Sequence, residues 1–249
     1  MGCAIELTVD SFSSADIEVE AEKISERIFL LESFTTESIR KLRREFSKQL
    51  ARSAPRFVVD LALRLLEHHT IEHRFVAYEL ICSHPGALAS LGEKDLKLLG
   101  RGLNSWSSVD MFACFLSGPA WRERKVSDRV IHRWAHSKDR WWRRVALVST
   151  VPLNSNARGG SGDSRRTLEV CRLLVSDRDD MVVKAMSWAL RELSKRDPKA
   201  VESFLDEQRD KLSARVLREV RNKLSTGLKN PKRNFARSDD AKTILADEI

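Results

Sequence analysis

The sequence contains little of what marks several common classes of protein. Its four cysteines, Cys3, Cys82, Cys114 and Cys171, are widely spaced and form no Cys-x-x-Cys pair. This spacing argues against a disulfide framework and a zinc site, and it predicts reduced, buried thiols. No apolar run approaches the roughly 18 residues of a membrane span, and the first residues lack the basic and then apolar pattern of a secretion signal. We therefore expect a cytoplasmic protein that has no contact with a membrane.

The motifs of several enzyme classes are also missing. No His-Glu-x-x-His motif or His/Cys pairing occurs among the six histidines, which are His68, His69, His73, His84, His132 and His136. No β-hairpin signal is present, so there is no strand from which a glycine-rich phosphate loop could start. Scattered Ser, His and Asp residues do not define a catalytic triad. We expect no metal and no cofactor.

What the sequence does contain is helical periodicity. Apolar residues recur at spacings of three and four in residues 17–31, 37–50, 55–69, 72–84, 128–137, 139–150, 167–176, 180–193 and 200–212. Helix starts and breakers lie between these segments, as at Ala54-Pro55 and Asp197-Pro198. The pattern predicts an all-α fold.

Three of these helical segments, and more loosely the stretch DMFACFL at 110–116, resemble one another around an alanine. The alanines are Ala77, Ala113, Ala146 and Ala185, at intervals of 36, 33 and 39 residues. Such intervals are close to the roughly 40-residue period of HEAT-like helix pairs, which stack into a curved array because no pair can bury its apolar face alone. The sequence therefore predicts a HEAT-like solenoid with divergent repeats.

The predicted array occupies most of the chain. We expect a short extension over residues 1–15, a single HEAT-like-repeat domain over 16–228, and a partly disordered tail over 229–249. Residues 153–162, LNSNARGGSG, have the composition of a flexible loop. Exposed backbone amides in that loop are an alternative contact for a phosphate.

Charge is unevenly distributed along the chain. The formal net charge is +8 and the sequence pI is about 9.5. Residues 1–35 carry eight acids and two bases, whereas residues 211–237 carry nine bases and one acid. A concentrated basic segment is typical of a protein that binds a polyanion. The alternative is a solvated helix face followed by a loose tail.

Tryptophan is the remaining unusual feature, with six tryptophans against one tyrosine. In the stretch NSWSSVDMF, Trp106 and Asp110 are four residues apart and so share one face of a helix. Trp106, Arg144 and Trp188 fall on successive helical units. Indole faces attract cations and stack on bases, and a guanidinium binds phosphate. The alternatives are core packing for the tryptophans, and a helix cap or an exposed charge for Asp110.

Several of these motifs resemble one known family. The segments SWSSVD, WWRRVAL, VVKAMSWALRELSKRDPKAV and LSARVLREV, within residues 105–220, are similar to motifs of the AlkD-type DNA alkylation-repair glycosylases, which have HEAT-like repeats. The resemblance implies that Asp110, Trp106 and Trp188 are catalytic and that Arg144 lies in the same cleft. It also implies removal of cationic N3- and N7-alkylated purines from duplex DNA without a metal. The family's early-helix tyrosine has no counterpart in residues 24–31.

The DNA-binding surface is expected to extend along the later helices. Its predicted members besides Arg144 are Trp141, Arg143, Lys184, Arg191, Arg215, Arg218 and Arg221. We expect a monomer that acts on double-stranded DNA containing alkylated purines, and that is nucleoid-associated in a bacterial cell. One alternative is a HEAT-like protein that binds bent, branched or damaged DNA without excision. A protein–protein scaffold is a third possibility, but it gives the Arg/Trp cluster no purpose.

Overall fold

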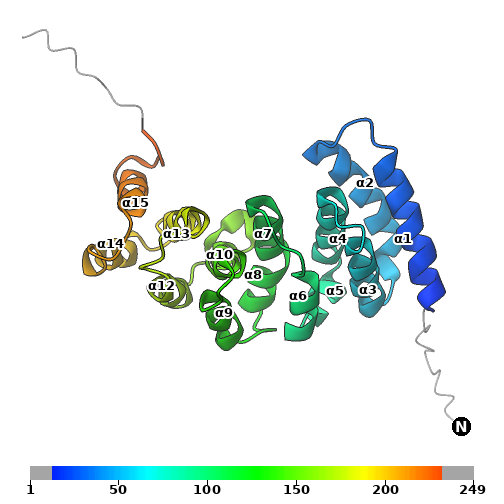
Figure 1. Ribbon diagram of the computed structural model, residues 1–249, viewed down its shortest axis with the longest axis horizontal. Coiled ribbons are helices and arrows are strands. Elements are labelled where there is room, and N and C mark those ends of the chain that lie inside the picture. The colour runs from blue at the N-terminus through cyan, green and yellow to red at the C-terminus, as the bar shows by residue number, and fades with distance from the viewer. Residues whose placement is uncertain (1–12, 232–249) are drawn as a thin grey trace, which may run out of the picture.

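The computed structural model describes residues 13–231, and every element of regular structure in this range is a helix. The helices stack into a curved array that opens toward the top of Figure 1. This arrangement confirms the predicted all-α solenoid. The array runs from Ser14 to Thr226, close to the predicted domain limits. Residues 1–12 and 232–249, which hold most of the predicted extension and tail, lie outside the described residues, so those two predictions stay untested.

One row of helices faces the open side of the array, and we call it the inner row. Its helices are α2 (Thr36–Gln49), α4 (Ile71–Ser83), α7 (Trp106–Phe112) with the π-helical turn η2 (Ala113–Ser117) and α8 (Gly118–Arg122), α10 (Arg140–Val148) with α11 (Val151–Asn154), α13 (Asp180–Leu193) and α15 (Ala214–Thr226). Each inner helix packs against the next one along the chain. The inner row therefore forms the concave side of the array (Figure 1).

The second row, which we call the outer row, lies behind the first. It consists of α1 (Ser14–Phe29), α3 (Pro55–Leu66), α5 (Pro85–Ser90), α6 (Glu93–Leu99), α9 (Asp128–Ala135), α12 (Ser164–Leu173) and α14 (Pro198–Glu207). Two short 3-10 turns connect the rows: η1 (Leu50–Arg52) lies between α2 and α3, and η3 (Asn156–Arg158) lies between α11 and α12. Helices α5 and α6 were not predicted, because they have only six and seven residues and so give too short a window for helical periodicity.

The core lies between the two rows and explains the repeated alanines. Ala77, Ala113, Ala146 and Ala185 are completely buried on α4, η2, α10 and α13. A methyl side chain at each site lets neighbouring helices pack closely, and the larger aliphatic residues fill the space around it. The alanine spacing therefore marks the repeat of the inner row.

Residues 153–162 differ from the predicted flexible loop. The Nε atom of Arg196 donates to the carbonyl of Asn154 at 2.9 Å, and the Nη1 atom of Arg122 donates to the carbonyl of Arg158. These two arginines follow α13 and end α8, so both are far from the loop in sequence. The polar, glycine-containing composition suggested mobility, but arginines from two other repeats hold the loop in place.

Gly118 allows one of the closest helix contacts in the array. A Cβ atom at this position would lie 2.8 Å from the carbonyl oxygens of Ala113 and Ser149 and 2.7 Å from Cγ of Pro152. We expect Gly118→Ala to lower the free energy of unfolding by about 1–3 kcal/mol through overpacking, although alanine has the higher helix propensity. Urea unfolding followed by circular dichroism measures the change. An equal or higher stability would show that α8 and α11 can separate without cost.

Candidate active site

The candidate active site is built around an ion pair between two inner helices. Asp110 on α7 accepts two hydrogen bonds from Arg144 on α10, one from Nε at 2.9 Å and one from Nη2 at 2.8 Å. The remaining nitrogen of the guanidinium, Nη1, donates to the carbonyl of Met181 on α13 at 2.6 Å. One arginine side chain therefore connects three successive inner helices and fixes both oxygens of the carboxylate.

This ion pair is poorly solvated. The side chain of Arg144 is 6% exposed and that of Asp110 is 18% exposed. Burial raises the pKa of the Asp110 carboxyl above its ordinary value, and the hydrogen bonds and charge of Arg144 oppose that rise only in part. The carboxylate is thus held in a fixed orientation at low solvation, where its field acts strongly on any nearby positive charge.

The position of Asp110 in its helix settles the two alternatives for that residue. Ser105 is the N-cap of α7, and its side chain accepts from the backbone of Ser108. Asp110 lies past the first turn and points into an ion pair, so it is neither a helix cap nor an exposed charge. Both alternatives are wrong for this residue.

Trp106 begins α7 one turn before Asp110, and its side chain reaches solvent. The residue is 60% exposed, so core packing is the wrong explanation for it. Trp188 on α13 is half-buried and packs against the core with part of its ring. Trp121, in contrast, is fully buried. The tryptophans therefore divide into core residues and residues that retain an accessible surface.

Arg191 lies one turn after Trp188 on α13 and is half-buried. Its Nε atom donates to Oγ of Ser187 at 3.2 Å, and burial lowers its pKa. The hydroxyl of Ser187 in turn donates to the buried carboxylate of Glu219 on α15 at 2.6 Å. Arg191 has no direct carboxylate partner among the described residues, which leaves its terminal amino groups for an anion.

Most of the other predicted DNA-binding bases are already paired. The ion pairs are Arg143 with Asp177 at 2.7 Å, Lys184 with Asp180 at 2.6 Å, Arg215 with Asp180 at 2.5 Å and Arg221 with Asp206 at 3.4 Å. Arg143 also donates to the carbonyls of Ser137 and Lys138, which gives it a structural role in the turn before α10. The guanidinium of Arg140 lies 4.8 Å from the ring centre of Trp141. Arg218 is exposed and makes no ion pair within the described range.

Sequence analysis missed one cation near the candidate active site. Arg158 comes from the loop 153–162, and its charge acts to lower the pKa of Asp110. The only local signal was an arginine before two glycines, which says nothing about proximity to α7. It also missed the π-helical turn η2, which begins three residues after Asp110. Such turns are frequent at functional sites.

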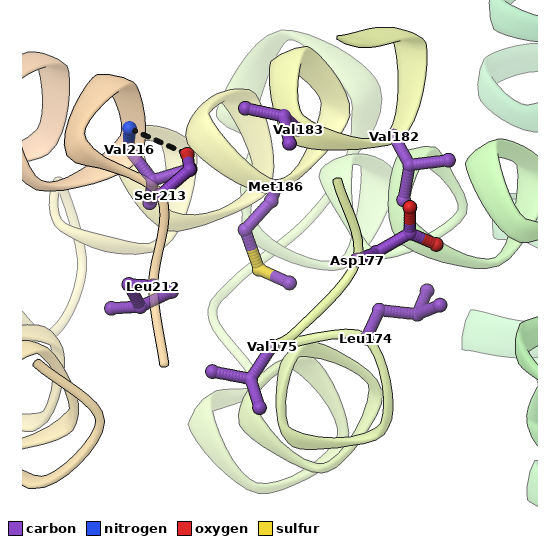
Figure 2. Close-up of a pocket in the computed structure, with 9 residues that line it drawn as sticks. All are labelled: Leu174, Val175, Asp177, Val182, Val183, Met186, Leu212, Ser213 and Val216. Carbon is purple, nitrogen blue, oxygen red and sulfur yellow. Dashed lines mark hydrogen bonds between the residues drawn. The ribbon is translucent and has the colours of Figure 1, made fainter. Parts of the chain in front are cut away.

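Two cavities lie near these residues. One, of about 520 Å³, is polar and is lined by Thr70, Arg74, Asn104 and the serines on both sides of Trp106. The other lies between α13 and α15 (Figure 2) and is lined by apolar side chains that include Met186, Leu212 and Val216. Its free volume of about 10 Å³ holds no more than one water molecule, so this crevice is packing space and is too small for a base.

Comparisons with known proteins agree with this architecture. The sequence profile of the family described as "DNA alkylation repair enzyme" matches residues 29–224. The match covers most of the chain, which therefore belongs to the DNA alkylation repair enzyme family. No curated protein sequence shows significant similarity to the chain.

A solved structure shares the fold. It is described as a predicted DNA alkylation repair enzyme from Enterococcus faecalis, and it matches with a TM-score of 0.64 and 17% sequence identity. The match covers 88% of this chain and 100% of the other. At this identity the likeness bears on the fold alone.

Two further observations concern the described residues 13–231. No group of three or more His, Cys, Asp or Glu side chains is arranged to hold a metal ion. No helix in this range has the length and apolar composition that crossing a membrane requires.

The raised pKa of Asp110 predicts how stability changes with pH. Because the folded pKa lies above the ordinary value of 3.8, the contribution of this carboxyl is present at low pH and is lost as pH rises through the folded pKa. The Asp110→Asn variant lacks that titration. The free energy of unfolding of the variant minus that of wild type should therefore increase as pH rises above about 4. Urea unfolding at several pH values tests this, and a fall would mean that the attraction of Arg144 outweighs burial.

Proposed function

We propose that this protein is a DNA glycosylase that hydrolyses the N-glycosidic bond of cationic N3- and N7-alkylated purines in duplex DNA, as the first step of base excision. The observation that carries the proposal is the partly buried Asp110 carboxylate, fixed by Arg144 and placed one turn from the exposed indole of Trp106. Membership in the DNA alkylation repair enzyme family supports it. The proposed enzyme needs no cofactor and acts as a monomer.

The chemistry suits a single carboxylate. An alkylated purine is already positively charged, so when the bond between C1′ and the ring nitrogen breaks, the electron pair neutralises the departing base. The sugar becomes oxocarbenium-like, and a fixed carboxylate stabilises that charge. Water then forms the new bond to C1′ and loses a proton. No general acid is required, because the leaving group carries its own activation.

The surroundings of Asp110 fit both parts of this role. Burial raises the pKa of the carboxyl, which makes the ionised form a better acceptor for the proton of the attacking water. The guanidinium of Arg144 favours the ionised form and orients both oxygens. Each carboxylate oxygen receives one hydrogen bond from Arg144, so each keeps a lone pair for water or for the sugar.

The two accessible tryptophans complete the proposed site. Trp106 presents most of its indole to solvent on the inner row, and Trp188 presents part of its ring two inner helices away. Indole faces attract cations, with about 0.5–1 kcal/mol at exposed sites and about 2 kcal/mol when the cation is desolvated. Both rings therefore favour a cationic lesion over a neutral base.

A second candidate function is DNA binding without excision. The observation that favours it is the same ion pair, because Arg144 already neutralises the charge that a glycosylase would direct at the sugar. In that case Asp110 and Arg144 would only connect the helices, and the inner row would recognise bent, branched or damaged DNA. Release of free base separates the two candidates.

The first test replaces the carboxylate without changing its shape. Asp110→Asn should slow single-turnover release of N7-methylguanine and N3-methyladenine by about 10²–10³-fold, because the charge matters most when the sugar is cationic. DNA affinity should stay close to wild type. The variant should fold but be less stable, because the buried guanidinium of Arg144 loses its charged partner, so thermal unfolding is measured alongside excision. The matched control is Asp180→Asn on α13, an exposed carboxylate paired with Lys184 and Arg215. The control should excise at the wild-type rate, and an equal rate in both variants would exclude Asp110 from the chemistry.

The second test separates binding tryptophans from core tryptophans. Trp106→Ala should leave the unfolding midpoint close to wild type, since the ring is mostly exposed, while excision falls. Trp121→Ala serves as the core reference and should lose about 3–5 kcal/mol of stability. Trp188→Ala should lie between them in stability and should also impair excision. If Trp106→Ala excises normally, its exposed indole has no part in handling the lesion.

A further inference from the structure

Two arginines at the N-terminal end of the inner row are held by one buried carboxylate. Arg40 and Arg43 on α2 each donate through Nε to Glu79 on α4, both at 3.0 Å. Glu79 is 7% exposed. Only the Nε atoms are used, so the terminal amino groups of both guanidiniums have no hydrogen-bond partner within residues 13–231. They are fixed in direction and still free to donate.

A row of ring contacts continues from these arginines toward the centre of the array. The guanidinium of Arg40 lies 5.9 Å from the ring centre of Phe75 on α4. Phe75 meets Phe115 of η2 edge to face, with 6.1 Å between the ring centres. The guanidinium of Arg158 lies 5.7 Å from the ring centre of Phe115. Both phenylalanines are half-buried. Each ring is in contact with the other ring and with one guanidinium.

Arg158 is the freest of these cations and the nearest to the candidate active site. Its side chain makes no hydrogen bond or ion pair with the described residues, and its charge acts on Asp110. The backbone of this residue is fixed, because Arg122 donates to its carbonyl. The charges of Arg158 and Arg43 also act together on the Cys82 thiol, so the two arginines share a neighbour. The ring contacts therefore run from α2 to Arg158, whose charge acts on Asp110.

The chemistry of this row fits a phosphodiester. Guanidiniums bind phosphate oxygens through paired N–H groups, and an arginine that is already fixed loses little entropy when it binds. The phenylalanine rings contact the arginines, so we do not assign them to base stacking. Arg158 differs from Arg143, Lys184, Arg215 and Arg221 on the later helices, which are all ion-paired. Arg40 and Arg43 are ion-paired too, but their two positive charges share the single charge of Glu79.

We infer that Arg40, Arg43 and Arg158 form a phosphate-binding track that holds the backbone of one DNA strand on one side of Asp110. We call this set the arginine track. Its location relative to a lesion rests on the proposed function, whereas its binding to duplex DNA does not depend on excision. The track places a DNA contact on α2, in the part of the chain where sequence analysis predicted none.

The test measures how the affinity for an unmodified duplex depends on salt. Arg158→Gln removes one cation and leaves Glu79 paired. A second variant combines Arg40→Gln, Arg43→Gln and Arg158→Gln with Glu79→Gln, because a buried carboxylate without a partner would destabilise the fold. The matched control is Arg129→Gln, an exposed arginine on α9 of the outer row that makes no ion pair within the described range. Thermal unfolding confirms that each variant is folded.

The expected changes follow from counterion release. The slope of log affinity against log salt should become shallower by about 0.9 for Arg158→Gln and by about 2.7 for the combined variant, with no change for the control. Between about 50 and 200 mM salt, wild type should then lose about 40-fold more affinity than the combined variant. A combined variant with the wild-type slope overturns the inference. A change seen with single-stranded DNA but not with duplex also overturns it.

A second arm tests the one-sided placement. Duplexes with N7-methylguanine near one end or near the other are compared for single-turnover release by wild type and by the combined variant. The variant should be impaired only when DNA extends to one particular side of the lesion. Equal impairment on both substrates contradicts the placement. If wild type releases no base at all, the proposed function fails, and the salt measurement still decides whether the arginine track binds DNA.

Discussion

The buried hydrogen bonds of Arg144 are the interaction on which the rest of the structure depends. This side chain joins the carboxylate of Asp110 on α7 to the carbonyl of Met181 on α13 from its own position on α10. Removing water from two charges is costly, so the pair persists only because the geometry is bidentate and the third nitrogen is also satisfied. One side chain therefore both connects three inner helices and orients the carboxylate.

Local patterns in the sequence predicted what depends on local structure. The spacing of apolar residues predicted the long helices, and the four-residue interval placed Trp106 and Asp110 on one helix. The pairing of Asp110 with Arg144 was not predictable, because those residues are 34 positions apart and meet only through the stacking of repeats. The same reason applies to the loop 153–162, whose anchors Arg122 and Arg196 lie in other repeats.

Net charge along the sequence does not show which cations are paired with acids. The basic C-terminal segment and α13 supplied most of the predicted DNA-binding residues, yet acidic partners engage many of them. Arg40 and Arg43 lie near an acidic N-terminal region and did not stand out in the sequence. Their shared partner Glu79 uses only one nitrogen of each. Which N–H groups remain unpaired is a property of tertiary contacts and has no signature in composition.

The π-helical turn η2 sets the register of the helix that carries Asp110. Its contacts with the α10–α11 segment include those of Asp110 before the turn and of Gly118 after it. Positions eight residues apart lie about 80° from each other around an uninterrupted α-helix, and a π turn takes up one residue of that interval. Shortening η2 by one residue would rotate its two ends by about 100° relative to each other. The helix could then keep the close packing of Gly118 or the pairing of Asp110 with Arg144, but not both. In this segment the number of residues therefore matters as much as their type.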